Sequence, residues 1–182
     1  TSTITLLLSS KGMALKKTSE IVAIGFDITE SAANTFTQEQ VNLQLSPLDQ
    51  EVFVVVAVDL DPSPPDNVTG TNTAVEMSVS STSLTGVGNL NQSQVIANTK
   101  IQIESEAGAL PGVGIGFTRT SLDTPQGELG YISIIATNDF FIQLKGRNNG
   151  AAKAGFGRMW GFRAKLDAAG YAAVVQSEVL SS

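Results

Sequence analysis

The amino-acid sequence predicts an all-β protein folded as a β-sandwich. Apolar and polar residues alternate with a period of two in many short segments, and β-branched residues are frequent in them. Glycine, proline and asparagine separate these segments at short spacing. Roughly eight to ten short strands divided by such turns are typical of a sandwich or a barrel. Of the two, we expect the sandwich.

The chain has 182 residues, which fits one domain of ordinary size. The sequence contains neither an internal repeat nor an interdomain linker. We therefore expect an N-terminal arm or extension over residues 1–17, followed by a single β-sandwich domain over residues 18–182. No run approaches the ~20 apolar residues that a transmembrane helix needs, so no transmembrane segment is expected.

The first strand of the domain is expected at residues 21–28, and the arm itself contains a candidate strand at residues 3–8. Residues 41–45 alternate apolar and polar side chains, the pattern of a half-buried strand. Residues 51–60 carry apolar side chains on both faces, which predicts a strand buried on both sides. Because the turn-forming residues 46–50 separate these last two segments, we expect them to form a hairpin.

The second half of the chain continues the pattern. The proline-rich residues 61–67 should end the preceding strand, because proline cannot continue a hydrogen-bonded ladder. Residues 80–98 are rich in glycine, serine and asparagine and predict a long loop, and Asn148–Gly150 predicts a tight turn. A short C-terminal helix is expected over residues 167–180, with Asp167 as its cap. Further strands are expected at 74–80, 100–105, 113–119, 131–136, 140–145 and 158–166.

The composition argues against an enzyme. The chain contains no cysteine and no histidine, which excludes thiol nucleophiles, disulfides, the Ser-His-Asp triad and nearly all zinc, copper and non-haem iron sites. Charged residues make up 15%, against a usual share of about 25%. A polar surface with few charges suits a protein covered by copies of itself or by a partner. We expect no catalytic residue and no cofactor.

Three carboxylates are candidate metal ligands. Asp59, Asp61 and Asp66 could gather around a calcium ion, which takes about six to eight oxygen ligands. However, Asp59 and Asp61 lie two residues apart at a strand end, and the sequence contains no EF-hand loop. We therefore interpret all three as solvated loop carboxylates and expect no metal site.

Two further patterns resemble catalytic or nucleotide-binding motifs. Glu104 and Glu106 would project from one face of a strand, as Asp49 and Glu51 would if extended, and a carboxylate pair is the minimum for a glycosidase. Such pairs are common on strands, and we interpret these as solvated. Residues 111–116 are glycine-rich but match neither G-x-G-x-x-G nor the P-loop, so they are better explained as a strand.

Charge is segregated along the chain. No basic residue lies between Lys17 and Lys100, and no acidic residue lies between Asp139 and Asp167. The net charge of −6 therefore combines an acidic half with a basic segment. The basic segment contains Lys145, Arg147, Lys153, Arg158, Arg163 and Lys165.

This segregation has three interpretations. In the first, basic strands pair with acidic ones inside the molecule, as cross-strand charges do. Alternatively, complementary patches guide neighbouring copies together and fix their register. Contact with nucleic acid inside a shell is the third, and it is not expected, because Phe156, Trp160 and Phe162 should be needed at least in part for the core.

Several features together resemble the small jelly-roll capsid proteins of tailless icosahedral viruses. They are the rhythm of strands and loops, the proline-rich turn at Asp61–Asp66, the long polar loop, and the ending Phe156–Leu166 with its expected helix. The resemblance covers most of the chain after Met13 and lies in architecture, so no functional residue is carried over. It implies a single jelly roll and a shell of repeated copies, often with a second coat protein or spikes.

We therefore expect a structural virion protein, a self-assembling capsid (coat) subunit whose partners are copies of itself and a second coat or spike protein. The alternative is a secreted or cell-surface β-sandwich module that binds carbohydrate or protein. Exposed aromatic rings would distinguish the alternative, because sugar sites stack rings on tryptophan or tyrosine. The residues expected at subunit contacts lie at the flexible ends and in the basic segment: Leu6, Leu7, Lys16, Lys17, Arg147, Lys153 and Arg158.

Overall fold

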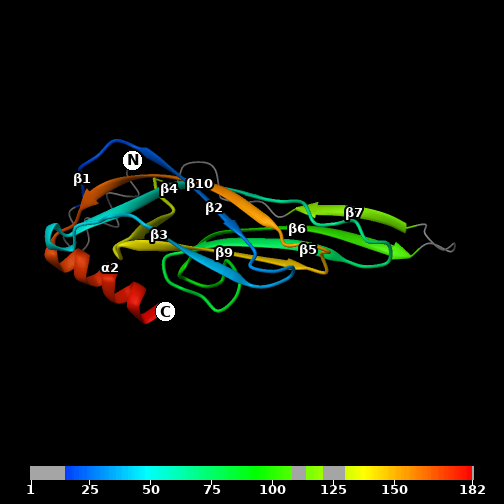
Figure 1. The fold of residues 1–182 in the computed structure, drawn as a ribbon. Coiled ribbons are helices and arrows are strands. Elements are labelled where there is room, and N and C mark those ends of the chain that lie inside the picture. Colours follow the sequence, from blue (N-terminus) through cyan, green and yellow to red (C-terminus); the bar gives the residue numbers. More distant parts are fainter. Residues whose placement is uncertain (1–14, 108–113, 121–129, 182) are drawn as a thin grey trace.

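A computed structural model describes residues 15–107, 114–120 and 130–181 of the chain. The described residues form two antiparallel sheets packed face to face, with one α-helix near the C-terminus (Figure 1). The β4 sheet contains β1 (Lys16–Lys17), β2 (Val22–Thr29), β4 (Glu51–Pro62), β8 (Ser133–Ile135) and β10 (Ala154–Lys165). The β5 sheet contains β3 (Thr37–Asn42), β5 (Thr73–Ser80), β6 (Val95–Ala107), β7 (Gly114–Thr120) and β9 (Asp139–Arg147).

The strand order is that of a jelly roll. The β4 sheet runs β2–β10–β4–β8, with β1 beside the far end of β10, and the β5 sheet runs β3–β9–β5–β6 with β7 added at its edge. From β2 onward the chain crosses between the sheets at each step except within β5–β6–β7. This interleaving of two Greek keys confirms the all-β sandwich and gives it the single jelly-roll topology.

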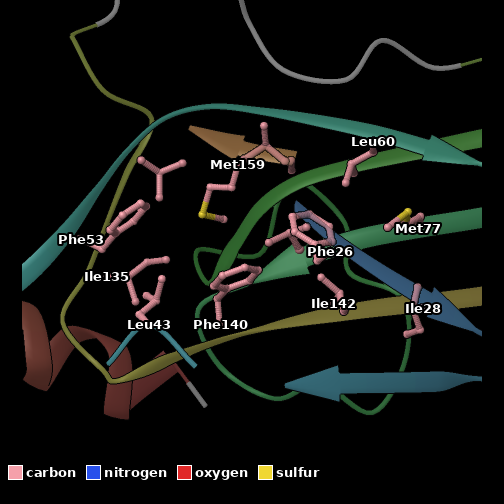
Figure 2. Close-up of a cluster of buried hydrophobic side chains, with 14 of the residues drawn as sticks. Phe26, Ile28, Leu43, Phe53, Leu60, Met77, Ile135, Phe140, Ile142 and Met159 are labelled. Carbon is pink, nitrogen blue, oxygen red and sulfur yellow. The ribbon is translucent and has the colours of Figure 1, made fainter. Parts of the chain in front are cut away.

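The main core lies between the two sheets (Figure 2). The strands that face this core contribute alternate residues to it, as a period of two requires. The rings of Phe26 and Phe140, from opposite sheets, meet edge to face with centroids 5.6 Å apart. Phe53 of β4 and Met77 of β5 are also fully buried there. The core thus joins strands that are distant in sequence.

A second apolar cluster covers the other face of β4. Val52 and Val54 point away from the main core and form this cluster with Ala164 and Leu166, against which Val175 of helix α2 (Ala168–Ser181) packs. The prediction that residues 51–60 are buried on both sides is therefore confirmed for the first half of the strand. The helix is also confirmed, and Asp167 accepts a hydrogen bond from the Gly170 N–H (2.7 Å) as a cap does.

The expected hairpin of residues 41–45 with 51–60 is wrong. β3 ends at Asn42 and pairs with β9, whereas β4 pairs with β10 and β8, so the two segments belong to different sheets. Gln44 adopts a left-handed φ of 53°, which breaks the extended backbone although Leu43 and Leu45 are buried. The apolar alternation here is produced by a connecting segment that enters the core. The short 3₁₀ turn η1 (Pro47–Asp49) then leads into β4.

Candidate functional site

Helix α2 covers only part of the outer face of the β4 sheet. The register between β4 and β10 shifts by one residue, since Trp160 pairs with Ala57 and Gly161 with Val55, which leaves Val56 as a bulge. The outward side chains before the bulge lie under α2, and those after it are not covered by any element of the described residues. We call this uncovered area the open face: Ala23, Gly25 and Asp27 of β2, Phe156, Arg158 and Trp160 of β10, and Ala57, Asp59 and Asp61 of β4.

The open face contains a shallow hollow of about 400 Å³ between β4 and β10. Phe156 is 52% exposed at its border, and Trp160 is half-buried. The Arg158 guanidinium lies 5.9 Å from the centre of the Trp160 ring, within the range of a cation–π contact. Asp59 and Asp61 complete the lining from β4. The hollow therefore combines apolar rings, a cationic donor and anionic acceptors.

The charges of the open face are not neutralised within the described part of the chain. Asp59 stands directly across from Arg158 in the strand register, yet neither it nor Asp27 or Asp61 forms an ion pair with another described residue. The carboxylates outnumber the guanidinium, so the open face is net negative. These groups remain available to hydrogen-bond a ligand.

The sequence of β10 explains why large side chains point outward. Its glycines face the core, where an added Cβ at Gly157 would lie 2.3 Å from the Phe26 ring and one at Gly155 would lie 2.8 Å from the Met77 sulfur. Phe26 and Met77 fill this part of the core (Figure 2). At these two positions only glycine therefore fits, while Met159 faces the core further along, and the intervening Phe156, Arg158 and Trp160 are displayed outward.

This arrangement corrects one prediction. Phe162 packs against the second apolar cluster, as expected of a residue needed for the core. Phe156 and Trp160 belong to neither apolar cluster. The signal was present in the sequence, because glycines at 155, 157 and 161 alternate with bulky residues, the reverse of an ordinary core strand.

The predicted contact residues are placed separately rather than in one patch. Leu6 and Leu7 lie outside the described residues. Lys16 and Lys17 form β1 at the Lys165 end of β10, with the Lys17 ammonium 5.3 Å from the centre of the Phe162 ring. Arg147 is the last residue of β9, and Lys153 directly precedes β10. Arg158 lies on the open face.

Most of the basic segment is paired within the molecule. Arg147 forms an ion pair with Glu76 (3.1 Å), and Lys153 forms one with Asp66 (2.6 Å). The remaining pairs of this kind join Arg163 to Glu51 (3.5 Å) and Lys165 to Asp49 (3.4 Å). The intramolecular interpretation of the segregated charge therefore holds for these four cations.

The three candidate metal ligands are not brought together. Asp59 and Asp61 lie on the open face, whereas Asp66 accepts hydrogen bonds from Lys153 and from the Gly150 N–H (2.8 Å). Hydrogen bonding from Lys153, more than any other cause, lowers the pKa of Asp66. Within residues 15–107, 114–120 and 130–181, no group of three or more acidic side chains could hold a metal ion.

Each candidate catalytic carboxylate that the structure describes takes part in a hydrogen bond or an ion pair within the molecule. Glu104 is exposed and accepts a hydrogen bond from the Gln102 amide (3.1 Å), while the side chain of Glu106 lies outside the described part. Asp49 and Glu51 are used in the ion pairs given above, and a hydrogen bond from Ser46 is the main cause that lowers the pKa of Asp49. In the glycine-rich segment 111–116, the strand prediction is confirmed from Gly114 onward.

A second hollow, of about 370 Å³, lies between α2, the approach to β8 and the loop after β5. Tyr131, Val174 and Glu178 are among its lining residues. The Glu178 carboxylate already accepts hydrogen bonds from the N–H groups of Ala136 and Thr137 (both 2.9 Å). Its polar group thus fixes the helix to the sheet, and the open face remains the better candidate for binding.

Comparison with known protein families gave no matching family model, and comparison with curated proteins gave no matching sequence. None of the helices in the described residues is long and apolar enough to cross a membrane. The function of this chain is therefore inferred from its fold and its surface.

Proposed function

We propose that this chain is a structural virion protein, a capsid (coat) subunit that assembles with copies of itself. The observation that carries the proposal is the strand order β2–β10–β4–β8 facing β3–β9–β5–β6. Viral capsid proteins are one of the main classes built on this jelly roll, although lectins and cupins share it. Because a fold alone does not determine function, the surface must also suit assembly.

The outer strands supply a means of assembly. Among the described strands, β2 has no neighbour on its outer side, so a backbone edge of eight residues is unpaired. Ile21 and Val22, where this edge begins, are 54% and 43% exposed. Unpaired edges and exposed apolar side chains favour contact with another chain. A contact repeated under closed symmetry would then build a shell.

The ion pairs within the subunit support contacts between subunits that depend mainly on interactions other than ion pairs. Arg147 and Lys153 are already used in ion pairs within the subunit, so the exposed Lys16 of β1 is the basic contact candidate best placed to meet a carboxylate of a neighbour. The same internal pairing leaves fewer cations for phosphate groups, which supports a shell protein without direct contact to nucleic acid. A second coat protein or a spike protein is the further partner that the proposal includes.

Blocking the β2 edge tests the proposal. We expect the purified chain to form large closed particles, and the double variant Ile21→Asp/Val22→Asp to remain a monomer with unchanged circular dichroism. Leu48→Asp is the matched control, because Leu48 is 97% exposed in η1, away from this edge. Particles from the double variant that equal those of the unmodified chain would refute the role of the edge.

A binding module at the cell surface or outside the cell is the second candidate. The open face favours it, because Phe156 is exposed beside unpaired charges and is not needed for the core. Exposed aromatic rings are the property expected to distinguish this class. A chain that stays monomeric at low and high concentration and binds a ligand through Phe156 would support this candidate over the coat subunit.

A further inference from the structure

We infer that the open face binds a neutral saccharide, with one sugar ring stacked on Phe156 and its hydroxyl groups hydrogen-bonded to Asp59, Asp61 and Arg158. The inference deepens the second candidate function, and it is also compatible with a coat subunit. Light scattering measures assembly and a ligand titration measures binding, so failure of one proposal is distinguishable from failure of the other.

The aromatic rings of the open face are available to contact a ligand. Phe156 projects from the first part of β10 with half of its surface exposed, although it contributes to neither apolar cluster. Trp160 lies on the same face of β10, four residues further along. The C–H face of a pyranose ring is apolar and packs on such rings, and covering Phe156 would remove apolar surface from water.

The polar component selects the class of ligand. Ionised Asp59 and Asp61 can only accept hydrogen bonds, whereas the Arg158 guanidinium can only donate them. Hydroxyl groups both donate and accept, so a polyol satisfies both kinds of partner at once. A polycation would be attracted by the carboxylates but offers no acceptor to the Arg158 guanidinium, and an anionic sugar would be repelled by the excess of carboxylates. The combination therefore favours an uncharged saccharide.

The shape of the face allows a ring to approach. Gly25 of β2 lies across from Arg158, and a Cβ built on it would have nothing within 4 Å. On the β2 side, therefore, no described side chain rises above the sheet directly across from the guanidinium, while Asp59 flanks it on the β4 side. The hollow of about 400 Å³ is within the range of small-ligand sites, and its openness to solvent suits a segment of a longer glycan.

Trp160 provides a direct readout, because it is the single tryptophan of the chain. We would titrate the full chain with lactose, maltotriose, mannotriose and chitotriose while following tryptophan fluorescence. Saturation-transfer NMR on each sugar gives a second readout that does not depend on Trp160. We expect saturable binding of at least one of these sugars with a dissociation constant of about a millimolar, as is usual for weak, shallow sites.

Two site variants and two controls complete the test. We expect Phe156→Ala and Asp59→Asn/Asp61→Asn each to weaken binding about tenfold or more. Leu48→Ala and Glu39→Gln, which alter exposed side chains outside the open face, should bind as the unmodified chain does. Binding to none of the four sugars, equal binding by the site variants, or a response to oligolysine alone would each overturn the inference.

Discussion

At the scale of single residues, two carboxylates show how local contacts set the charge state. Burial is the main cause that raises the pKa of Glu178, against the opposing effect of its two backbone hydrogen bonds. Asp66 is more exposed, and the hydrogen bond from Lys153 lowers its pKa instead. The two groups therefore make the stability of the fold depend on pH in opposite directions.

We expect the Glu178→Gln variant to isolate one of these effects. Because the pKa of Glu178 is raised above its usual value of 4.5, the contribution of this group is fully present below that value and is lost as the pH rises through the folded-state pKa. Glutamine does not titrate. The unfolding free energy of the unmodified chain minus that of the variant should thus fall as the pH rises above 4.5. Urea unfolding across this range measures it, and a difference that grows with pH would contradict the assignment.

At the scale of elements, β10 determines where the open face lies. Its inward glycines allow close packing on Phe26, so an added methyl group at Gly157 has no room. We expect Gly157→Ala to lower the unfolding free energy by about 1–3 kcal/mol, the usual cost of overpacking. Gly25→Ala on β2 is the matched control and should be neutral or slightly stabilising, because its Cβ would meet open space. Urea midpoints compare the two, and equal losses would show that packing against Phe26 is not the cause.

The elements also show how far a sequence can be interpreted. The strand over residues 51–60 and the helix after Asp167 were predictable, because the first is a run of β-branched residues and the second begins at a capping aspartate. The turn at Asn148 was predictable too, and that residue has a left-handed φ of 56°. The pairing of residues 41–45 was not predictable, because Gln44 leaves the extended region without a glycine or proline to signal it.

The long loop after β5 shows a second limit of prediction. It was expected from its composition, but the reason that it stays on the sheet lies in buried polar contacts. The Gln143 amide is fully buried and donates hydrogen bonds to Gln38 (2.9 Å) and Ser80 (2.7 Å), while Gln38 accepts one from the Leu84 N–H (2.7 Å). A glutamine on the polar side of a strand predicts solvent exposure, because the covering loop is recognisable only in three dimensions.

The open face could be predicted only in part. Asp59 and Asp61 were interpreted as solvated loop carboxylates. Both are exposed, but they lie on β4, which continues through Pro62, and not in a loop. Their position beside Phe156 and Arg158 depends on the pairing of β4 with β10, which joins residues about a hundred positions apart in the chain. Such pairings are set by the whole fold, and no local pattern specifies them.

At the scale of the whole molecule, the charges and the edges have separate roles. Ion pairs such as Arg147 with Glu76 are used to join strands within the subunit. No element of the described residues covers the long unpaired edge of β2 or the open face, and the two point in different directions on the β4 sheet. Edge contacts can therefore build an assembly while the open face stays accessible to a ligand.

The most direct test of the central proposal is size-exclusion chromatography with light scattering on the purified chain, followed by negative-stain images of the leading peak. We expect large closed particles of uniform size, formed by the unmodified chain and lost when the β2 edge carries two aspartates. A monodisperse monomer at every concentration, also after addition of a candidate second coat protein, would contradict the coat-subunit proposal.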